Sequence, residues 1–82
     1  SVYTREAIDF LQANGTATLA QIKNHYMSDC QRAYTIGTAS SQAGQMMKLL
    51  PLIGVATLSD KTLDVIENSK VLEAMQRAAN KS

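Results

Sequence analysis

The fold is decided where a helical pattern gives way to an alternating one, in the stretch Met46-Met47-Lys48-Leu49-Leu50-Pro51-Leu52-Ile53-Gly54-Val55-Ala56-Thr57-Leu58. Up to this point, apolar residues recur at the i, i+3, i+4 and i+7 spacing of a buried helix face, at Ala43, Met46, Met47 and Leu50. Pro51 disfavours the α conformation at the residue before it, so we expect the regular helix to end at Leu50. The same helix is predicted to open within Thr38-Ala39-Ser40-Ser41, where several hydroxyl groups compete for the cap.

Downstream, the polarity of the side chains predicts the register of a β-hairpin. A turn at Asp60-Lys61 gives the cross-strand pairs Ala56–Val65, Thr57–Asp64, Leu58–Leu63 and Ser59–Thr62. Because side chains alternate across a strand, one face of this hairpin is then apolar and the other is polar. Asp-Lys lacks the Gly or Asn that a two-residue turn prefers, and a four-residue loop from Ser59 to Thr62 keeps the same register.

Two more helices are predicted upstream. Thr4 is expected to cap the first, with Tyr3 and Ile8 as a hydrophobic staple and Asn14-Gly15 as its end. Thr16-Ala17-Thr18 can pair briefly at a sheet edge. Thr18 and Gln21 fit a capping box that opens the second helix, which should run to Ser28 or Asp29. Its apolar positions are Leu19, Ile22 and Tyr26, and we expect a loop from Cys30 to Ala39.

A last helix is predicted after the hairpin, capped by Asn68 or Ser69. Glu73 and Arg77 stand four residues apart in the favourable orientation for an ion pair. The apolar positions of this helix are Val71, Leu72, Met75, Ala78 and Ala79. The chain is therefore expected to be mainly α with a small β-hairpin, an α+β fold in the order α-β-α-α-β-β-α.

Length, charge and cysteine content narrow the class of protein. With 82 residues, of which 45 % are hydrophobic, the chain should form one domain over residues 1–82. Its net charge of +1 does not supply the basic excess typical of nucleic-acid binders. The single cysteine, Cys30, excludes an internal disulfide and a multi-cysteine zinc site, and it favours a reducing cytoplasm. No apolar run approaches the length needed to span a membrane.

In three stretches, the chain resembles the winged helix-turn-helix superfamily of DNA-binding domains. The stretches are residues 5–15, residues 16–22 and the Met46–Leu58 segment, which looks like a recognition helix leaving through a Leu-x-x-Leu-Gly-Val step into the wing. The resemblance covers about residues 4–67. The chain departs from the family's pattern in its long connection at 30–39 and in Pro51, which falls in the last turn of the recognition helix.

The resemblance implies that the third helix enters the major groove of double-stranded DNA and that the wing contacts the backbone. The groove-facing candidates on the helix are Ser41, Gln42, Gln45 and Lys48, whose side chains can bind base edges or phosphates. Arg32 in the loop and Lys61 at the wing tip are candidate phosphate contacts. The alternative is that these residues form an ordinary solvated surface.

Gly44 lies within this same helix, where it costs about 1 kcal/mol relative to Ala. Either the close approach of a partner or tight packing against the second helix would explain it.

The charge balance predicts weak binding by one protomer. Between Cys30 and Leu63, three cations (Arg32, Lys48 and Lys61) stand against one anion, Asp60, which leaves +2. So few cations imply a shallow salt dependence, and DNA binding would then need a dimer or a larger complex. The last helix, at 69–80, either packs back onto the hairpin and the first helix or mediates that pairing.

An enzyme is not expected. His25 and Cys30 are five residues apart at a helix end, and no carboxylate at a suitable spacing orients the imidazole. No metal-ligand cluster, phosphate-binding Gly loop or cofactor motif is present. The prediction is a DNA-binding transcriptional regulator or accessory factor that acts as a dimer. The alternative is a protein–protein interaction module, a subunit or inhibitor that docks on a larger complex without binding DNA.

Overall fold

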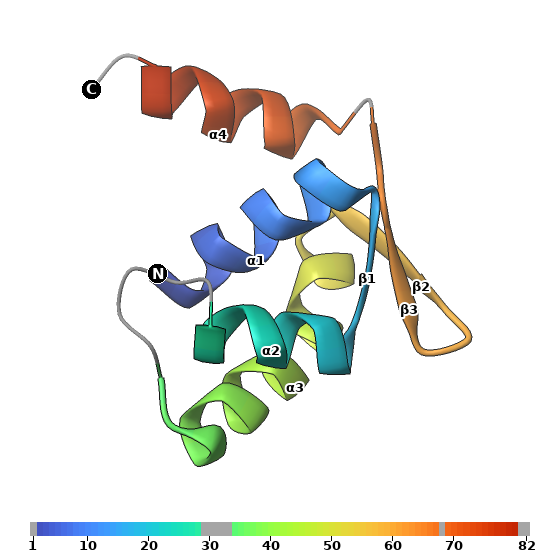
Figure 1. The fold of residues 1–82 in the computed structure, drawn as a ribbon. Helices are drawn as coiled ribbons and strands as arrows, with labels where there is room; N and C mark the ends of the chain where they lie inside the picture. Colours follow the sequence, from blue (N-terminus) through green and yellow to red (C-terminus); the bar gives the residue numbers. More distant parts are fainter. Residues whose placement is uncertain (1, 29–33, 68, 81–82) are drawn as a thin grey trace.

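In the computed structural model, which describes residues 2–28, 34–67 and 69–80, helices dominate and three short strands form one antiparallel sheet (Figure 1). The elements follow the predicted order. They are α1 (Val2–Asn14), β1 (Thr16–Thr18), α2 (Leu19–Ser28), α3 (Ile36–Leu52), β2 (Ala56–Ser59), β3 (Thr62–Val65) and α4 (Lys70–Asn80). The prediction of a mainly helical α+β chain is therefore confirmed.

The first two helices are joined through a tight turn and a capping box. Gly15, at φ +80°, ends α1 and donates its N–H to the carbonyl of Leu11 at 2.7 Å. Thr18 and Gln21 form the predicted reciprocal pair, with N···O distances of 3.0 and 3.2 Å. The prediction that Thr4 caps α1 is wrong, because the helix begins at Val2 and Thr4 lies inside its first turn.

Helix α3 is longer at both ends than the sequence suggested. Thr35 is its N-cap and accepts a hydrogen bond from the N–H of Thr38, so the helix begins at Ile36 and not within 38–41. The predicted loop 30–39 is correspondingly too long. At the other end Pro51 lies inside the last turn, which continues to Leu52, and the N–H of Ile53 bonds to Leu49. Because Pro51 donates no ladder hydrogen bond and its ring crowds the carbonyl one turn earlier, the helix continues for only one more residue.

The hairpin has the predicted register in all four cross-strand pairs, and β1 adds to the other side of β3 with Ala17 opposite Leu63. The strand order is β1-β3-β2. Only Asp60 and Lys61 separate the strands, and both have positive φ, +49° and +60°. The chain therefore adopts the two-residue turn despite having neither Gly nor Asn, because the register of the paired strands requires it.

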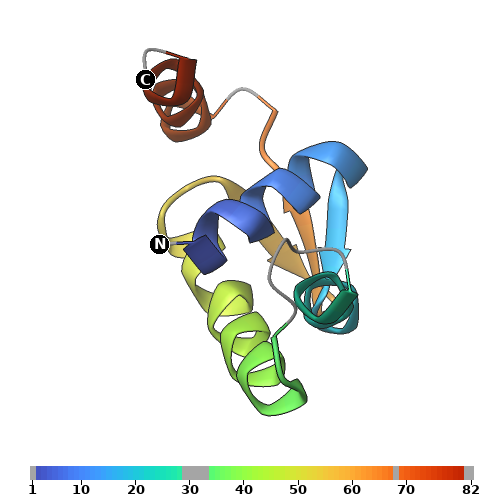
Figure 2. The same cartoon turned by 60° about the vertical axis from the view of Figure 1, so that its left-hand side comes forward.

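The core lies between α1, α2, α3 and the inner face of the sheet (Figure 2). Tyr26 of α2 is fully buried and donates its hydroxyl to the carbonyl of Tyr3 at 2.7 Å. Tyr3, Tyr26 and Tyr34 also contact one another as rings. The predicted apolar face of α3 is buried throughout, at Ala43, Met46, Met47 and Leu50.

Helix α4 lies at one end of the molecule, beside α1 and away from α2 and α3 (Figures 1 and 2). Ser69 caps it by accepting the N–H of Leu72, and donates its own hydroxyl to the carbonyl of Gly54 at 2.8 Å. The other proposed cap, Asn68, lies outside the described residues. Of the predicted apolar stripe Leu72 is buried, whereas Val71, Met75 and Ala78 are exposed. The predicted packing of this stripe onto the hairpin and α1 is therefore correct only in part.

In the described part of the chain, every helix is too short or too polar to cross a lipid bilayer.

Candidate nucleic-acid interface

One face of α3 carries the predicted polar residues to the surface. Ser41, Gln45 and Lys48 are exposed and follow one another at spacings of four and three, which places them in one row along the helix. Gln42 is half-buried and lies beside this row. The buried residues Ala43, Met46, Met47 and Leu50 hold the opposite face against the core, so the orientation of the polar row is determined by packing.

An open groove, which we call the α3 groove, lies between α3, the start of α2 and strand β2. Three of the four residues predicted on the helix line this groove, namely Ser41, Gln45 and Lys48, whereas Gln42 does not. The full lining comprises Leu19, Ser40, Ser41, Gly44, Gln45, Met47, Lys48 and Leu58. The groove thus combines amide, hydroxyl and ammonium groups with apolar side chains.

The remaining predicted contacts are not part of the groove. Lys61 is exposed in the hairpin turn, three residues after Leu58, and is not among the residues that line the groove. Arg32 lies outside the described residues. Asp60 and Asp64, both exposed, share the hairpin with Lys61, so the positive charge on this side of the described structure is small.

Two residues of the groove were not expected at the surface. Leu19 and Leu58 belong to the predicted apolar faces of a helix and of the hairpin, yet their exposed fractions are 42 % and 48 %. Both have the predicted periodicity, but Leu19 is the first residue of α2 and Leu58 is next to the last of β2. Residues near the end of a helix or strand are covered less by the neighbouring elements than residues in its middle. In the sequence, only the position of each leucine near the end of its element could have indicated that it is exposed, and this is a weak indication.

Gly44 lines the α3 groove, and no packing contact within the protein requires a glycine there. A Cβ built on it would meet no heavy atom within 4 Å beyond its own stretch of helix. Tight packing against α2, one of the two explanations offered above, is therefore contradicted. The glycine still costs the helix about 1 kcal/mol relative to Ala.

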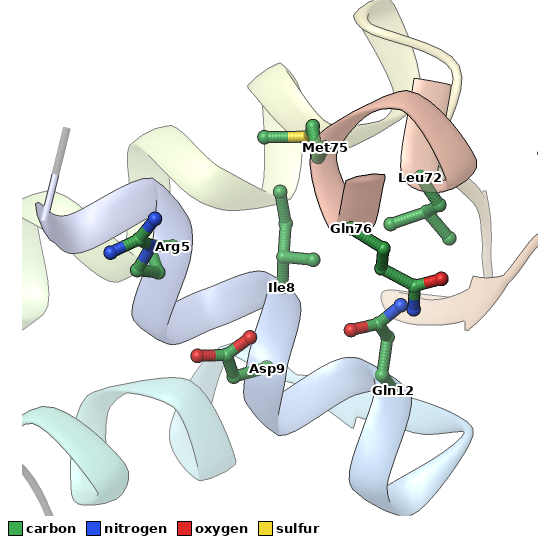
Figure 3. A pocket seen from close by; sticks show the side chains of 7 residues that line it. All are labelled: Arg5, Ile8, Asp9, Gln12, Leu72, Met75 and Gln76. Atoms are coloured by element: carbon green, nitrogen blue, oxygen red, sulfur yellow. The ribbon is translucent and has the colours of Figure 1, made fainter. Parts of the chain in front are cut away.

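A second hollow, of about 110 Å³, lies between α1 and α4 (Figure 3). Ile8 points from α1 toward α4, where Leu72 and Met75 face it, and Gln12 and Gln76 form part of the rim. Its apolar floor and polar rim make it a contact surface between the two helices. The hollow shows that α4 covers α1 incompletely.

His25 has a carboxylate partner that the sequence did not reveal. Its Nε2 lies 2.9 Å from Oε2 of Glu6 on α1, and its ring lies against Phe10 with centroids 5.2 Å apart. The expectation that no carboxylate orients this imidazole is wrong, because the packing of α1 on α2 brings together residues 19 apart in the sequence. Cys30 lies outside the described residues. Within the described ranges, no three His, Cys, Asp or Glu side chains form a group that could hold a metal ion.

Comparisons with models of protein families, with curated proteins and with solved structures found no match to this chain.

Proposed function

We propose that this chain is a small double-stranded-DNA-binding protein of the winged helix-turn-helix kind. One observation carries the proposal: the polar row of α3 is exposed and shares an open groove with the hairpin that follows it. The order of elements supports it, since a third helix followed by an antiparallel hairpin is the arrangement in which a recognition helix precedes a wing.

In this proposal α3 lies in the major groove and the hairpin lies along the DNA backbone. Gln45 can form two hydrogen bonds with adenine, and Ser41 can bond to a base or a phosphate. Lys48 and Lys61 contribute phosphate contacts, as would Arg32. With so few cations, one protomer should bind weakly and depend only modestly on salt.

A dimer would compensate for this weakness, and α4 is the surface that we propose for it. Val71 and Met75 are exposed on α4, and the hollow beside α1 leaves further apolar surface open to a second copy. Met75→Glu should then lower the sedimenting mass to that of a monomer without unfolding the chain. The role we propose for the dimer is that of a transcriptional regulator or accessory factor in the cytoplasm.

The experiment is a titration of duplex DNA at about 50 and 200 mM salt. Lys48→Ala should weaken binding and lower the salt slope by about one, whereas the matched control Lys70→Ala, an exposed lysine on α4, should change neither. Gln45→Ala should cost about 1–3 kcal/mol at a site that contains adenine. An affinity that neither Lys48→Ala nor Gln45→Ala lowers would contradict the proposed docking face.

The second candidate is a protein-interaction module that docks on a larger complex without DNA. The exposed leucines Leu19, Leu58 and Leu52, the last 82 % exposed, favour it, because large apolar groups at a surface commonly mark protein contacts. It predicts no duplex binding even at the lower salt concentration. That single result would decide between the two functions.

A further inference from the structure

The lining of the α3 groove includes a glycine, Gly44, at a position where a side chain would stabilise the helix. Gly44 lies mid-helix, and an added Cβ would touch nothing within 4 Å there, so alanine would fit at no steric cost. Alanine is the better helix former at such a position. The glycine therefore serves no packing purpose within the protein, and it allows an outside group to approach the helix backbone closely.

The walls of the groove restrict what that group is. Leu19 and Leu58 line the groove and leave apolar surface exposed, while Gln45 and Lys48 contribute hydrogen-bond donors to the same lining. An occupant must therefore present an apolar group next to hydrogen-bonding edges. Lys48 in the groove, with Lys61 at the end of the hairpin, adds that negative charge should accompany it.

Duplex DNA meets these requirements at A·T base pairs. In the major groove thymine displays its C5-methyl group and adenine displays N7 and N6, while phosphates flank both. Cytosine offers an amino group in place of the methyl, and burying that donor against leucine would cost its hydrogen bond to water. The chemistry of the groove therefore matches A·T better than G·C.

We propose that the α3 groove receives thymine methyl groups over Gly44, between Leu19 and Leu58, and that the protein accordingly prefers A·T-containing sites. This inference rests on the DNA-binding function proposed above and adds its base preference. Gln45 bonds to the adenine of a contacted pair, and Lys48 holds the adjacent phosphate.

The test compares duplexes that differ only in the methyl group. The probes are a duplex of alternating dA and dT about 20 base pairs long, two turns of B-DNA, and the same duplex with deoxyuridine in place of thymidine. A duplex of alternating dG and dC of the same length completes the set. The protein should bind the thymine duplex more tightly than the uracil duplex, by about fourfold for each methyl group that is covered, and should bind the G·C duplex most weakly.

Two variants locate the contact, and each has a matched control. Gly44→Ala adds a methyl group to the groove lining and replaces glycine by a better helix former. It should raise the melting temperature by about 4–8 °C and yet abolish the preference for thymine over uracil. Gly37→Ala adds the same group on α3 in open space outside the groove, and should leave the preference intact. Leu58→Ala should also abolish the preference, whereas Leu52→Ala, at an exposed leucine outside the groove, should not.

Equal binding of thymine and uracil duplexes would overturn this inference while leaving the DNA-binding function in place. A preference that survives in both Gly44→Ala and Leu58→Ala would overturn it as well. Failure to bind any duplex would overturn the proposed function and this inference together. Sedimentation that shows a dimer dissociated by Gly44→Ala would assign the groove to a second copy of the chain and would equally reject the thymine contact.

Discussion

Helices α3 and α4 have similar sequence patterns but differ in how far their apolar residues are buried. Both carry apolar residues at helical spacing, yet α3 buries its whole stripe, whereas on α4 Leu72 is buried and Met75 is 40 % exposed. Helix α3 packs against α1, α2 and β2, whereas α4 lies at the end of the molecule, where it faces α1 and its Val71 lies near Gly54. The comparison teaches that periodicity reports which face of a helix is apolar, and that the surrounding elements decide whether the face is covered.

The largest expected effect tests this difference directly. Leu50→Ala on α3 removes a fully buried side chain and should destabilise the protein by about 2–5 kcal/mol, since it leaves a cavity in the core. Met75→Ala on α4 should cost less, about 1 kcal/mol, because that side chain is 40 % exposed and loses fewer buried contacts than Leu50. Urea unfolding followed by circular dichroism measures both values. Similar losses for the two variants would show that α4 belongs to the same packed unit as α3.

An intermediate effect is expected at the attachment of α4. Ser69→Ala removes both the N-cap of α4 and the hydrogen bond to Gly54, which together should cost about 1–2 kcal/mol. Hydrogen exchange should accelerate throughout α4 more than in α3. Ser41→Ala, at an exposed hydroxyl of α3, is the control and should leave the exchange of both helices unchanged. Uniform acceleration in α3 and α4 would contradict a separate attachment of α4.

The smallest effect is expected from the ion pair on α4. Arg77 Nη2 lies 3.7 Å from Glu73 Oε2, and both side chains are mostly exposed, so water and salt screen the pair. Arg77→Ala should cost about 0.2–0.5 kcal/mol in the helix. A double-mutant cycle with Glu73→Ala, measured at low and high salt, isolates this energy. A coupling above about 1 kcal/mol would mean that α4 is less solvated than its exposed fractions indicate.

Local signals predicted much of the fold. The register of the hairpin followed from its polarity alone, since any one-residue slip would place apolar side chains in water. The sequence also predicted the capping box of Thr18 and Gln21 and the end of α1 at Gly15. Both depend on hydrogen bonds between residues that are three or four positions apart. The exact starts of α1 and α3 were not, because several residues near each end can serve as caps.

The candidate site was predictable only in outline. The row Ser41, Gln45 and Lys48 followed from helical spacing, and the structure places it in one groove. The exposed Leu19 and Leu58 were missed, because their periodicity is that of buried residues. The contact between His25 and Glu6 was missed for a related reason, since no spacing rule relates residues on two different helices.

The sequence by itself determined the order of the elements, the register of the hairpin and the polar and apolar faces of each helix. These features depend on interactions between residues that are near in the chain or paired across one tight turn. Only the tertiary structure decided that Leu50 is buried while Met75 is exposed, and that Gly44 lines one groove together with Leu19 and Leu58. Burial depends on which distant elements meet at a given face, and that meeting is set by the packing of the whole chain.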